Sequence, residues 1–381
     1  MRIVVLGYIV RGPLGGLVWH HLQYVVGLKQ MGHDVLFLED SDDFAGCYNP
    51  ETFETSIDPQ YGLKFIKNIF DSLDLRNNWA YYDAHTNTWY GQSKQAVFSF
   101  CNKADIVINV SGVNPLRNWW TCVPTRIFVD TDPAFTQIKH LTDNKAMEHA
   151  KAHTHFATFG ENFGKSICSI PDDGLPWRST RQPLCIELWK VSEEQIHANW
   201  TTVMQWDSYK QGDYDGKVYG MKSLSFKPFI SLPKHTNEKL ELALGSPNAP
   251  REELIHDGWI ISDPLEATRT PQVFQNYIAN SKGEWSVAKH GYVITNSGWF
   301  SERTLNYMAS GKPVIVQDTG LKDLLPTGIG VLTFSNVNEA AEQIERVNAD
   351  YSLHGKKARE IAIDFFDADK VLQSLLSMGN E

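Results

Sequence analysis

The first forty residues constrain the fold more than any other stretch of this chain. Residues 2–9 form an almost continuous apolar run, and residues 35–38 form a second one. Between them lies a helical pattern of apolar residues that ends at Gly32. Strands that are apolar along their whole length are covered on both faces, as in a parallel sheet. The start of the chain therefore predicts a β-α-β unit and an α/β fold.

A glycine-rich loop follows the first predicted strand. It reads Gly-Pro-Leu-Gly-Gly over residues 12–16, and open α/β sheets bind their ligands at the carboxyl ends of strands. The glycines stand at Gly12, Gly15 and Gly16, which is not the GxGxxG spacing of dinucleotide-binding loops. The spacing argues against an NAD-dependent oxidoreductase, and the glycines can equally serve only to make a tight turn.

Length and composition limit the classes of protein. A chain of 381 residues exceeds what one core usually holds, so we expect two domains. A net charge of −10 argues against general binding to nucleic acid. The five cysteines show no metal or disulfide spacing, which favours free thiols in the cytoplasm. No run approaches the ~20 apolar residues of a transmembrane segment.

Two candidates for a catalytic base lie near predicted strand ends. The apolar strand at residues 126–130 delivers Asp130 and Asp132 at its carboxyl end, where a carboxylate pair suits general acid–base chemistry. The alternative is that these residues cap the next helix. His20 lies on the first helix, away from its apolar stripe, and is a second candidate. The Asp-x-Asp spacing of residues 130–132 matches a metal-binding pattern, but such pairs arise often by chance, and we expect no metal site.

The stretch GWFSERTLNYMASGKPVIVQDTG, residues 298–320, predicts a loop, a short helix and a strand. Ser301 is a plausible N-cap, Gly311 provides the left-handed residue after the helix, and Pro313 prevents its continuation. A helix N-terminus with a hydroxyl group and the guanidinium of Arg303 suits a phosphate or diphosphate group. An ordinary capped helix of an α/β domain is the other interpretation.

The second half repeats the α/β pattern. Strands are expected at residues 201–206, 240–244 and 258–262, and a helix is expected to begin at Thr270. Residues 171–183 hold three prolines and a glycine, so they are the best candidate for a linker. We therefore expect two α/β halves, each with its own sheet, and a ligand crevice between their strand ends.

The segment ERTLNYMASGKPVIVQDTG, followed by LPTGIGVLTF and a closing helix, resembles the donor domain of GT-B glycosyltransferases of the family 1/family 4-like group, which includes the spore-coat-type glycosyltransferases. The N-terminal GPLGG, the helix after it and GHDV resemble the opening of the acceptor domain of that group. The resemblance implies two Rossmann-like domains with a ligand cleft between them. It places the acceptor-binding domain at residues 1–185, the nucleotide-sugar-binding domain at residues 186–360, and a C-terminal helix that packs back on the first domain at residues 361–381.

The resemblance also implies a donor site for a nucleotide-diphospho-sugar, a UDP- or GDP-sugar, without a cofactor. The residues that match it in position are Ser301, Glu302, Arg303 and Thr304 at the helix start, Lys289 or Lys222 as a second cation, and Gly15 and Gly16 beside the phosphates. Retaining members carry two glutamates eight positions apart, and Gly298 and Asn306 stand there in this chain. Glu302 either takes over the contact to a hydroxyl group of the sugar or ribose, or is only an acidic residue in the first turn that the helix dipole stabilises. The choice between retention and inversion stays open.

The expected function is transfer of a sugar to a hydroxyl or amine of an acceptor, without a metal. The expected acceptor is a small molecule, a glycan or a peptide rather than nucleic acid, and Asp130 and then His20 are the candidate bases. A sugar-nucleotide epimerase or hydrolase of the same fold is an alternative. A noncatalytic sugar- or nucleotide-binding protein is another, because the glutamate pair is missing.

Overall fold

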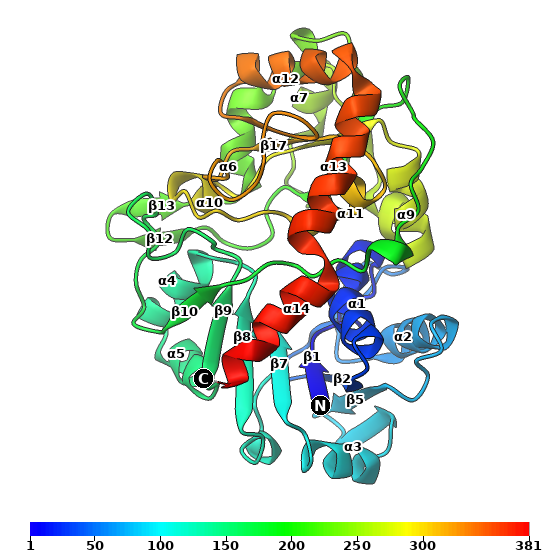
Figure 1. Ribbon diagram of the computed structural model, residues 1–381, viewed down its shortest axis with the longest axis vertical. Helices are drawn as coiled ribbons and strands as arrows, with labels where there is room; N and C mark the ends of the chain where they lie inside the picture. The colour runs from blue at the N-terminus through cyan, green and yellow to red at the C-terminus, as the bar shows by residue number, and fades with distance from the viewer. Residues whose placement is uncertain (381) are drawn as a thin grey trace.

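The computed structural model describes residues 1–380, which form two α/β units stacked along the long axis of the molecule (Figure 1). The lower unit in this view holds an eight-stranded sheet and the upper unit a six-stranded sheet. The strands of the first sheet lie within residues 2–179, and those of the second lie within residues 200–334. The limits of the two domains at 185/186 and 360/361 stay predictions.

The first sheet has the order β10-β9-β8-β7-β1-β2-β5-β6, and within it only β6 is antiparallel to its neighbour. Its strands are β1 (Arg2–Leu6), β2 (Asp34–Asp40), β5 (Trp79–Asp83), β6 (Thr88–Gly91), β7 (Ile106–Val110), β8 (Thr125–Asp130), β9 (His155–Thr158) and β10 (Trp177–Ser179). The second sheet has the order β15-β14-β11-β16-β17-β18, and all its pairs are parallel. Its strands are β11 (Trp200–Gln205), β14 (Leu240–Gly245), β15 (Ile260–Ser262), β16 (Gly283–Ser286), β17 (Val314–Gln317) and β18 (Val331–Phe334).

Helices cover both faces of each sheet, as the apolar strands predict. Ile3 and Val5 of β1 pack into one core cluster, whereas Val4 and Leu6 pack into another on the opposite face. The α-helices of the first unit are α1 (Gly15–Gln30), α2 (Gln60–Ser72), α3 (Lys94–Cys101), α4 (Phe135–Thr142) and α5 (Asn144–Lys151). Those that follow are α6 (Lys222–Phe226), α7 (Arg251–His256), α8 (Pro264–Thr268), α9 (Pro271–Ala279), α10 (His290–Ile294), α11 (Glu302–Ala309), α12 (Val337–Ala349), α13 (Tyr351–Phe366) and α14 (Ala368–Ser377).

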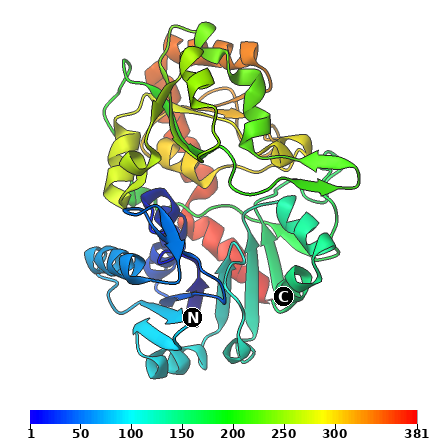
Figure 2. The same cartoon turned by 180° about the vertical axis from the view of Figure 1, so that it is seen from behind.

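The two units also contain short hairpins and 3₁₀ turns. Two hairpins pair β3 (Cys47–Asn49) with β4 (Glu54–Ser56), and β12 (Gly212–Tyr214) with β13 (Lys217–Tyr219). Seen from behind, the β12–β13 hairpin reaches out from the second unit beside α4 of the first (Figure 2). The 3₁₀ turns are η1 (Asn118–Trp120), η2 (Ile186–Leu188), η3 (Lys227–Phe229), η4 (Leu232–Lys234) and η5 (Met378–Asn380).

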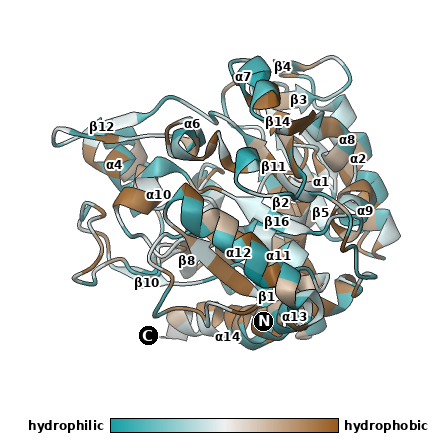
Figure 3. Cartoon of the chain, turned by 90° about the horizontal axis from the view of Figure 1, so that it is seen from above, coloured by the Kyte–Doolittle hydropathy of each residue, from teal (hydrophilic) through white to brown (hydrophobic). Residues whose placement is uncertain are grey.

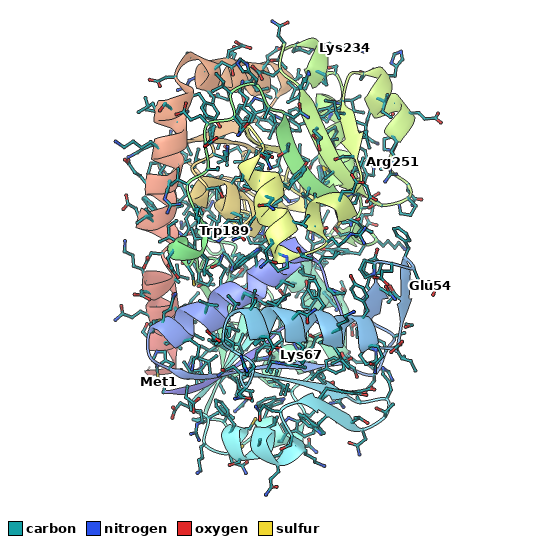
Figure 4. The ribbon with its side chains drawn as sticks, turned by 90° about the vertical axis from the view of Figure 1, so that its right-hand side faces the viewer. Met1, Glu54, Lys67, Trp189, Lys234 and Arg251 are labelled. Atoms are coloured by element: carbon teal, nitrogen blue, oxygen red, sulfur yellow. The ribbon has the colours of Figure 1, made fainter. Side chains whose placement is uncertain are left out.

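The expected linker at residues 171–183 is wrong in part. Residues 177–179 form β10, which extends the first sheet by pairing in parallel with β9. The chain passes to the second sheet between β10 and β11. Trp189, in this passage, is almost fully buried and packs on Trp19 of α1 with ring centroids 5.1 Å apart. Figure 4 shows Trp189 at the level where the two units meet.

The chain returns to the first unit through α13 and α14 (Figure 1). The predicted single C-terminal helix is two helices, because the backbone of Leu184 pairs with residues 366 and 368 and interrupts the helix at Asp367. The Asp367 side chain then caps α14, which packs on α1. A Cβ added to Gly27 of α1 would lie 2.7 Å from Leu372. The two helices thus fit closely, and the last helix packs on the first unit as the resemblance implies.

One apolar core joins the two units. A single cluster of buried residues contains Ile3 and Val5 of the first sheet and Val314 and Val316 of the second. Helices α1, α9, α11, α13 and α14 carry this cluster across the junction. Helix α12 is amphipathic: hydrophilic and hydrophobic residues alternate along it (Figure 3), and Ala340, Ile344 and Val347 form its buried side.

The structure also describes the cysteines, the apolar character of the helices and the grouping of potential metal ligands. Each of the five cysteines is a free thiol. Within residues 1–380, no helix combines the length and the apolar character needed to cross a bilayer. Over the same residues, no group of three or more His, Cys, Asp and Glu side chains is arranged to hold a metal ion.

Candidate functional site

The stretch from Gly298 to Gly320 forms the predicted loop, helix and strand. Ser301 caps α11, and its Oγ accepts a hydrogen bond from the backbone N–H of Arg303 at 3.2 Å. Gly311 follows the helix with φ of +74°, and β17 begins at Val314. The capping serine and the glycine that ends the helix therefore define this loop, helix and strand. The start of α11 offers free N–H groups and the positive end of the helix dipole, and α11 contacts α1 of the first unit.

Arg303 lies at this end of α11 and forms an ion pair. Its Nε donates to Oε1 of Glu284 at 2.6 Å, and the Glu284 side chain is 0% exposed. Burial lowers the pKa of Arg303, but Glu284 and Glu302 outweigh this effect and the net shift is upward. Within the described chain, Oε2 of Glu284 has no hydrogen-bond partner. Glu284 therefore fixes the guanidinium, which keeps its positive charge.

Lys222 adds a second cation beside Arg303. Among residues 1–380 its ammonium group has no hydrogen bond and no ion pair. Burial and then the charge of Arg303 lower the pKa of Lys222 to about 7, whereas Glu302 and Glu284 oppose this shift. Two neighbouring cations, one of them unpaired and partly buried, favour the binding of an anion. This pair is the strongest sign of a ligand site in the described part of the molecule.

Glu302 is the carboxylate closest in sequence to these cations. It is partly exposed and makes no side-chain hydrogen bond within the described part of the chain. Its charge raises the pKa values of Tyr8, His20 and Tyr24 of the first unit. Glu302 thus stands where groups from both units meet.

Tyr8 was missed by the sequence analysis. It follows β1 at the junction, and its ring packs edge-on against His21 with centroids 4.8 Å apart. Burial first, and then Glu302, raise the pKa of Tyr8 to about 12. Its hydroxyl has no protein partner among residues 1–380. The Gly7-Tyr8 position at the end of the first strand was the available signal.

His20 is buried and held by Gln182 from the passage between the sheets. Its Nδ1 lies 2.6 Å from Oε1 of Gln182, whose amide nitrogen donates to the carbonyl groups of His20 and Pro183. Those two bonds orient the amide, so Nδ1 of His20 carries the proton and Nε2 keeps its lone pair. Burial lowers the pKa of His20. The imidazole is therefore neutral at pH 7.

Asp130, the first choice of a base, is bound by side chains of its own unit. It is 1% exposed. Its Oδ1 accepts from the hydroxyl of Thr136 at 2.6 Å and from the N–H of Asp132 at 2.9 Å. Its Oδ2 accepts from Thr158 at 2.7 Å and from Gln137 at 3.1 Å. Burial raises the pKa of Asp130, and these hydrogen bonds oppose that shift. Asp130 therefore holds together the turn after β8.

Asp132 and Lys289 join the two units instead. Nζ of Lys289 donates to Oδ1 of Asp132 at 2.8 Å, and the side chains are 14% and 31% exposed for the lysine and the aspartate. The hydroxyl groups of Tyr209 and Tyr292 also donate to this carboxylate. The sequence predicted Lys289 as a donor-binding cation, and in the structure its ammonium group donates to Asp132 and to the hydroxyl of Tyr209. The tyrosines come from distant parts of the chain and were not predicted.

Gly15 and Gly16 pack against the second unit. A Cβ on Gly15 would lie 2.2 Å from the carbonyl oxygen of Thr270, at the start of α9. A Cβ on Gly16 would lie 3.3 Å from the ring of Phe274. The two glycines therefore allow α1 and α9 to approach closely.

Thr304 lies in the first turn of α11. It is 0% exposed, and its hydroxyl has no partner among residues 1–380. It lines a small cavity with Ser286 and Ser301, of about 10 Å³, which is about the space that one water molecule needs. Thr304 therefore faces the interior behind the start of α11.

The comparisons with known proteins concern the fold. No protein-family model and no curated protein sequence matches the chain. An alpha-glucosyltransferase in complex with UDP and a 13-mer DNA matches with a TM-score of 0.60 and 12% identity, over 100% of this chain and 99% of that one. HepE from Anabaena, in complex with UDP and glucose, matches with a TM-score of 0.57 and 12% identity, over 99% of both chains.

Sucrose-phosphate synthase from Thermosynechococcus elongatus matches with a TM-score of 0.54 and 13% identity, over 99% of this chain and 98% of that one. These matches extend over whole chains and include both sheets. The fold implied by the sequence resemblance is therefore confirmed, and the chain has the GT-B fold of two Rossmann-like domains.

Proposed function

We propose that this protein is a glycosyltransferase that moves a sugar from a nucleotide-diphospho-sugar to a hydroxyl or amine of an acceptor. The observation that carries the proposal is the pair of neighbouring cations, Lys222 and Arg303, beside the N-terminus of α11. A departing nucleoside diphosphate accumulates negative charge, and fixed cations and helix N–H groups stabilise it. Because two protein cations supply this charge, the proposed reaction needs no metal, and chelators are expected to leave it unchanged.

UDP-sugars are the first donors to test. The solved structures of the alpha-glucosyltransferase and of HepE contain UDP, and these proteins share the fold of this chain. A GDP-sugar is the next candidate. In the proposed complex Lys222 and Arg303 bind the diphosphate. Glu302, which has no hydrogen-bond partner within residues 1–380, accepts a hydrogen bond from a hydroxyl group of the sugar or ribose.

The acceptor lies on the side of the first domain in this proposal. His20 is neutral and keeps a lone pair on Nε2, as a base for an acceptor hydroxyl requires. Glu302 influences its pKa, so the two groups share one electrostatic environment. We therefore propose His20 as the base of an inverting transfer. The expected acceptors are small molecules, glycans and peptides, and DNA belongs in the panel because the alpha-glucosyltransferase structure contains it.

A sugar-nucleotide hydrolase is the second candidate. Gly298 and Asn306 stand where the resembled family has its two glutamates, so the contacts that would normally hold the transferred sugar differ here. Release of UDP from UDP-glucose at the same rate with and without every acceptor in the panel would favour hydrolysis. A rate that rises with one acceptor supports transfer.

The test of the donor site is the substitution Lys222→Met. Loss of an ionic phosphate contact is expected to weaken UDP binding at least tenfold, because hydrogen bonds to charged groups contribute about 1.5–3 kcal/mol. Isothermal titration with UDP and GDP measures this change. The matched control is Lys227→Met, which removes an exposed lysine from the following turn and should not change the affinity. Equal affinities of the wild type and Lys222→Met would refute the proposed site.

A further inference from the structure

A carboxylate of the first domain occupies a set of donors in the second. Oδ1 of Asp132 accepts from Nζ of Lys289 at 2.8 Å and from the hydroxyl of Tyr292, and Oδ2 accepts from the hydroxyl of Tyr209. The Lys289 ammonium lies 5.1, 4.4 and 5.4 Å from the ring centroids of Phe135, Tyr209 and Tyr292. Lys289, Tyr209 and Tyr292 are called the anion pocket below, because their three donor groups converge on one anion.

The anion pocket adjoins the proposed donor site. The backbone N–H groups of residues 290 and 291 donate to the carbonyl groups of Met221 and Gly220 at 3.4 and 3.1 Å. Lys289 and Lys222 therefore stand on either side of one backbone junction. The two lysines also interact electrostatically, since the charge of Lys289 contributes to the lowered pKa of Lys222. An anion bound by Lys222 is thus also attracted by Lys289.

Asp132 and the anion pocket belong to different domains. Asp132 follows β8 of the first sheet, whereas Tyr209, Lys289 and Tyr292 follow strands β11 and β16 of the second sheet. A movement of the two domains apart therefore withdraws the Asp132 carboxylate from the anion pocket.

Withdrawal of Asp132 leaves a partly buried ammonium and two phenol hydroxyls without their anion. A charge in such a setting is strongly destabilising unless another partner replaces the lost one. A diphosphate is the matching partner, since its oxygens accept several hydrogen bonds and carry negative charge. The pocket offers three such donors next to Lys222.

We propose that the anion pocket binds the diphosphate of the donor, and that Asp132 is the internal anion that occupies it while the two domains are closed. This inference rests on the proposed donor site. Asp132 and the donor then exclude each other from Lys289. Asp132 limits the affinity for the donor and closes the two domains again after the diphosphate leaves.

Asp132→Asn tests the competition, because it removes the negative charge and keeps the shape of the side chain. The apparent dissociation constant for UDP equals the intrinsic one divided by the fraction of molecules with a free pocket. We expect Asp132→Asn to tighten UDP binding by about fivefold or more. The control is Asp43→Asn, which changes the net charge equally. Asp43 is 79% exposed and pairs with Arg117, so its substitution should leave UDP binding unchanged.

The Lys289→Gln background makes the test specific. If Asp132 acts by occupying Lys289, the tightening should disappear when Asp132→Asn is combined with Lys289→Gln. Tightening that persists in this background, or an Asp132→Asn variant that binds UDP no tighter than the wild type, would overturn the inference. Asp132→Ser serves in the same way if Asp132→Asn does not fold.

The same titrations separate this inference from the proposed function. A wild type that binds UDP through Lys222 but shows no effect of Asp132→Asn removes only the competition. A wild type that binds no nucleoside diphosphate, and whose Asp132→Asn variant binds none either, removes the proposed donor site together with the inference.

Discussion

At the scale of single residues, the buried pair of Arg303 and Glu284 determines how the site can be tested. Arg303→Ala leaves the Glu284 carboxylate, which is 0% exposed, without its cation. Removal of one partner of a buried ion pair destabilises a protein by about 3–5 kcal/mol. We expect a loss of this size in urea denaturation of Arg303→Ala, and partial recovery when Glu284→Gln is added. A stability within about 1 kcal/mol of the wild type would contradict this account.

The experiment also affects how activity data are read. A loss of turnover in Arg303→Ala alone combines a lost phosphate contact with a disturbed fold. Lys222 has no ion-pair partner among residues 1–380, so its substitution separates the two effects.

The pKa of Lys222 predicts a pH dependence of donor binding. The folded value of about 7 lies below the unfolded value of 10.5. The unfolded chain therefore binds more protons between these values, and the contribution of Lys222 to stability rises with pH across this window. A bound diphosphate favours the charged ammonium, so binding above about pH 7 takes up a proton. The affinity for UDP-glucose is expected to fall from about pH 7 to about pH 8.5, by at most tenfold per pH unit.

Calorimetric titration in buffers of different ionisation enthalpy measures this proton uptake directly. Lys222→Met should show neither the proton uptake nor the fall in affinity. Equal proton uptake by the variant and the wild type would assign it to another group.

Asp130 and Asp132 show why the sequence predicted only part of the site. Both follow one apolar strand, and their position at its end was predictable from the pattern. Which carboxylate faces the other domain depends on Thr136 and Thr158, whose hydroxyls bind Asp130 inside the first domain. The partners of Asp132 lie 77 to 160 positions away in sequence, and no local pattern predicts such contacts.

At the scale of secondary-structure elements, the approach of α1 to α9 depends on Gly15. A Cβ there would lie 2.2 Å from a backbone oxygen, whereas a Cβ on Gly16 would meet the edge of the Phe274 ring at 3.3 Å. Gly15→Ala is expected to lower the free energy of unfolding by about 1–3 kcal/mol, as overpacking does. Gly16→Ala should have a smaller effect, because a ring shifts more easily than a backbone. Urea denaturation without nucleotide compares the two variants.

If these glycines instead served only to admit phosphates, the outcome would differ. Both variants would then keep the stability of the wild type and lose affinity for UDP.

Elements with strong local signals were predicted, and elements defined by their neighbours were not. The continuous apolar runs of β1, β2 and β8 identify buried parallel strands, and Thr270-Pro271 identifies the start of α9. Strand β10 has the sequence Trp-Arg-Ser and lies at the edge of the sheet. It has no apolar run, and pairing with β9 alone makes it a strand. The break at Asp367 likewise follows from pairing with Leu184.

At the scale of the whole molecule, the shared core predicts that the two domains unfold together. One cluster of buried residues contains strands of both sheets and the helices between them. Separation of the domains would expose this apolar surface to water, at about 25 cal/mol per Å². We expect a single calorimetric transition whose measured enthalpy equals its van't Hoff enthalpy. Two resolved transitions would show that each domain keeps its own stability.

The return of α14 to the first domain has a consequence for biosynthesis. Strand β10 completes the first sheet at residue 179, yet the helix that covers α1 begins at residue 368. A ribosome adds about 5–20 residues per second, so the intervening ~190 residues take roughly 10–40 s. During this time the face of α1 around Gly27 lacks its cover. The nascent first domain therefore exposes an apolar surface until the last helix emerges. We expect chaperones to bind this surface during that interval.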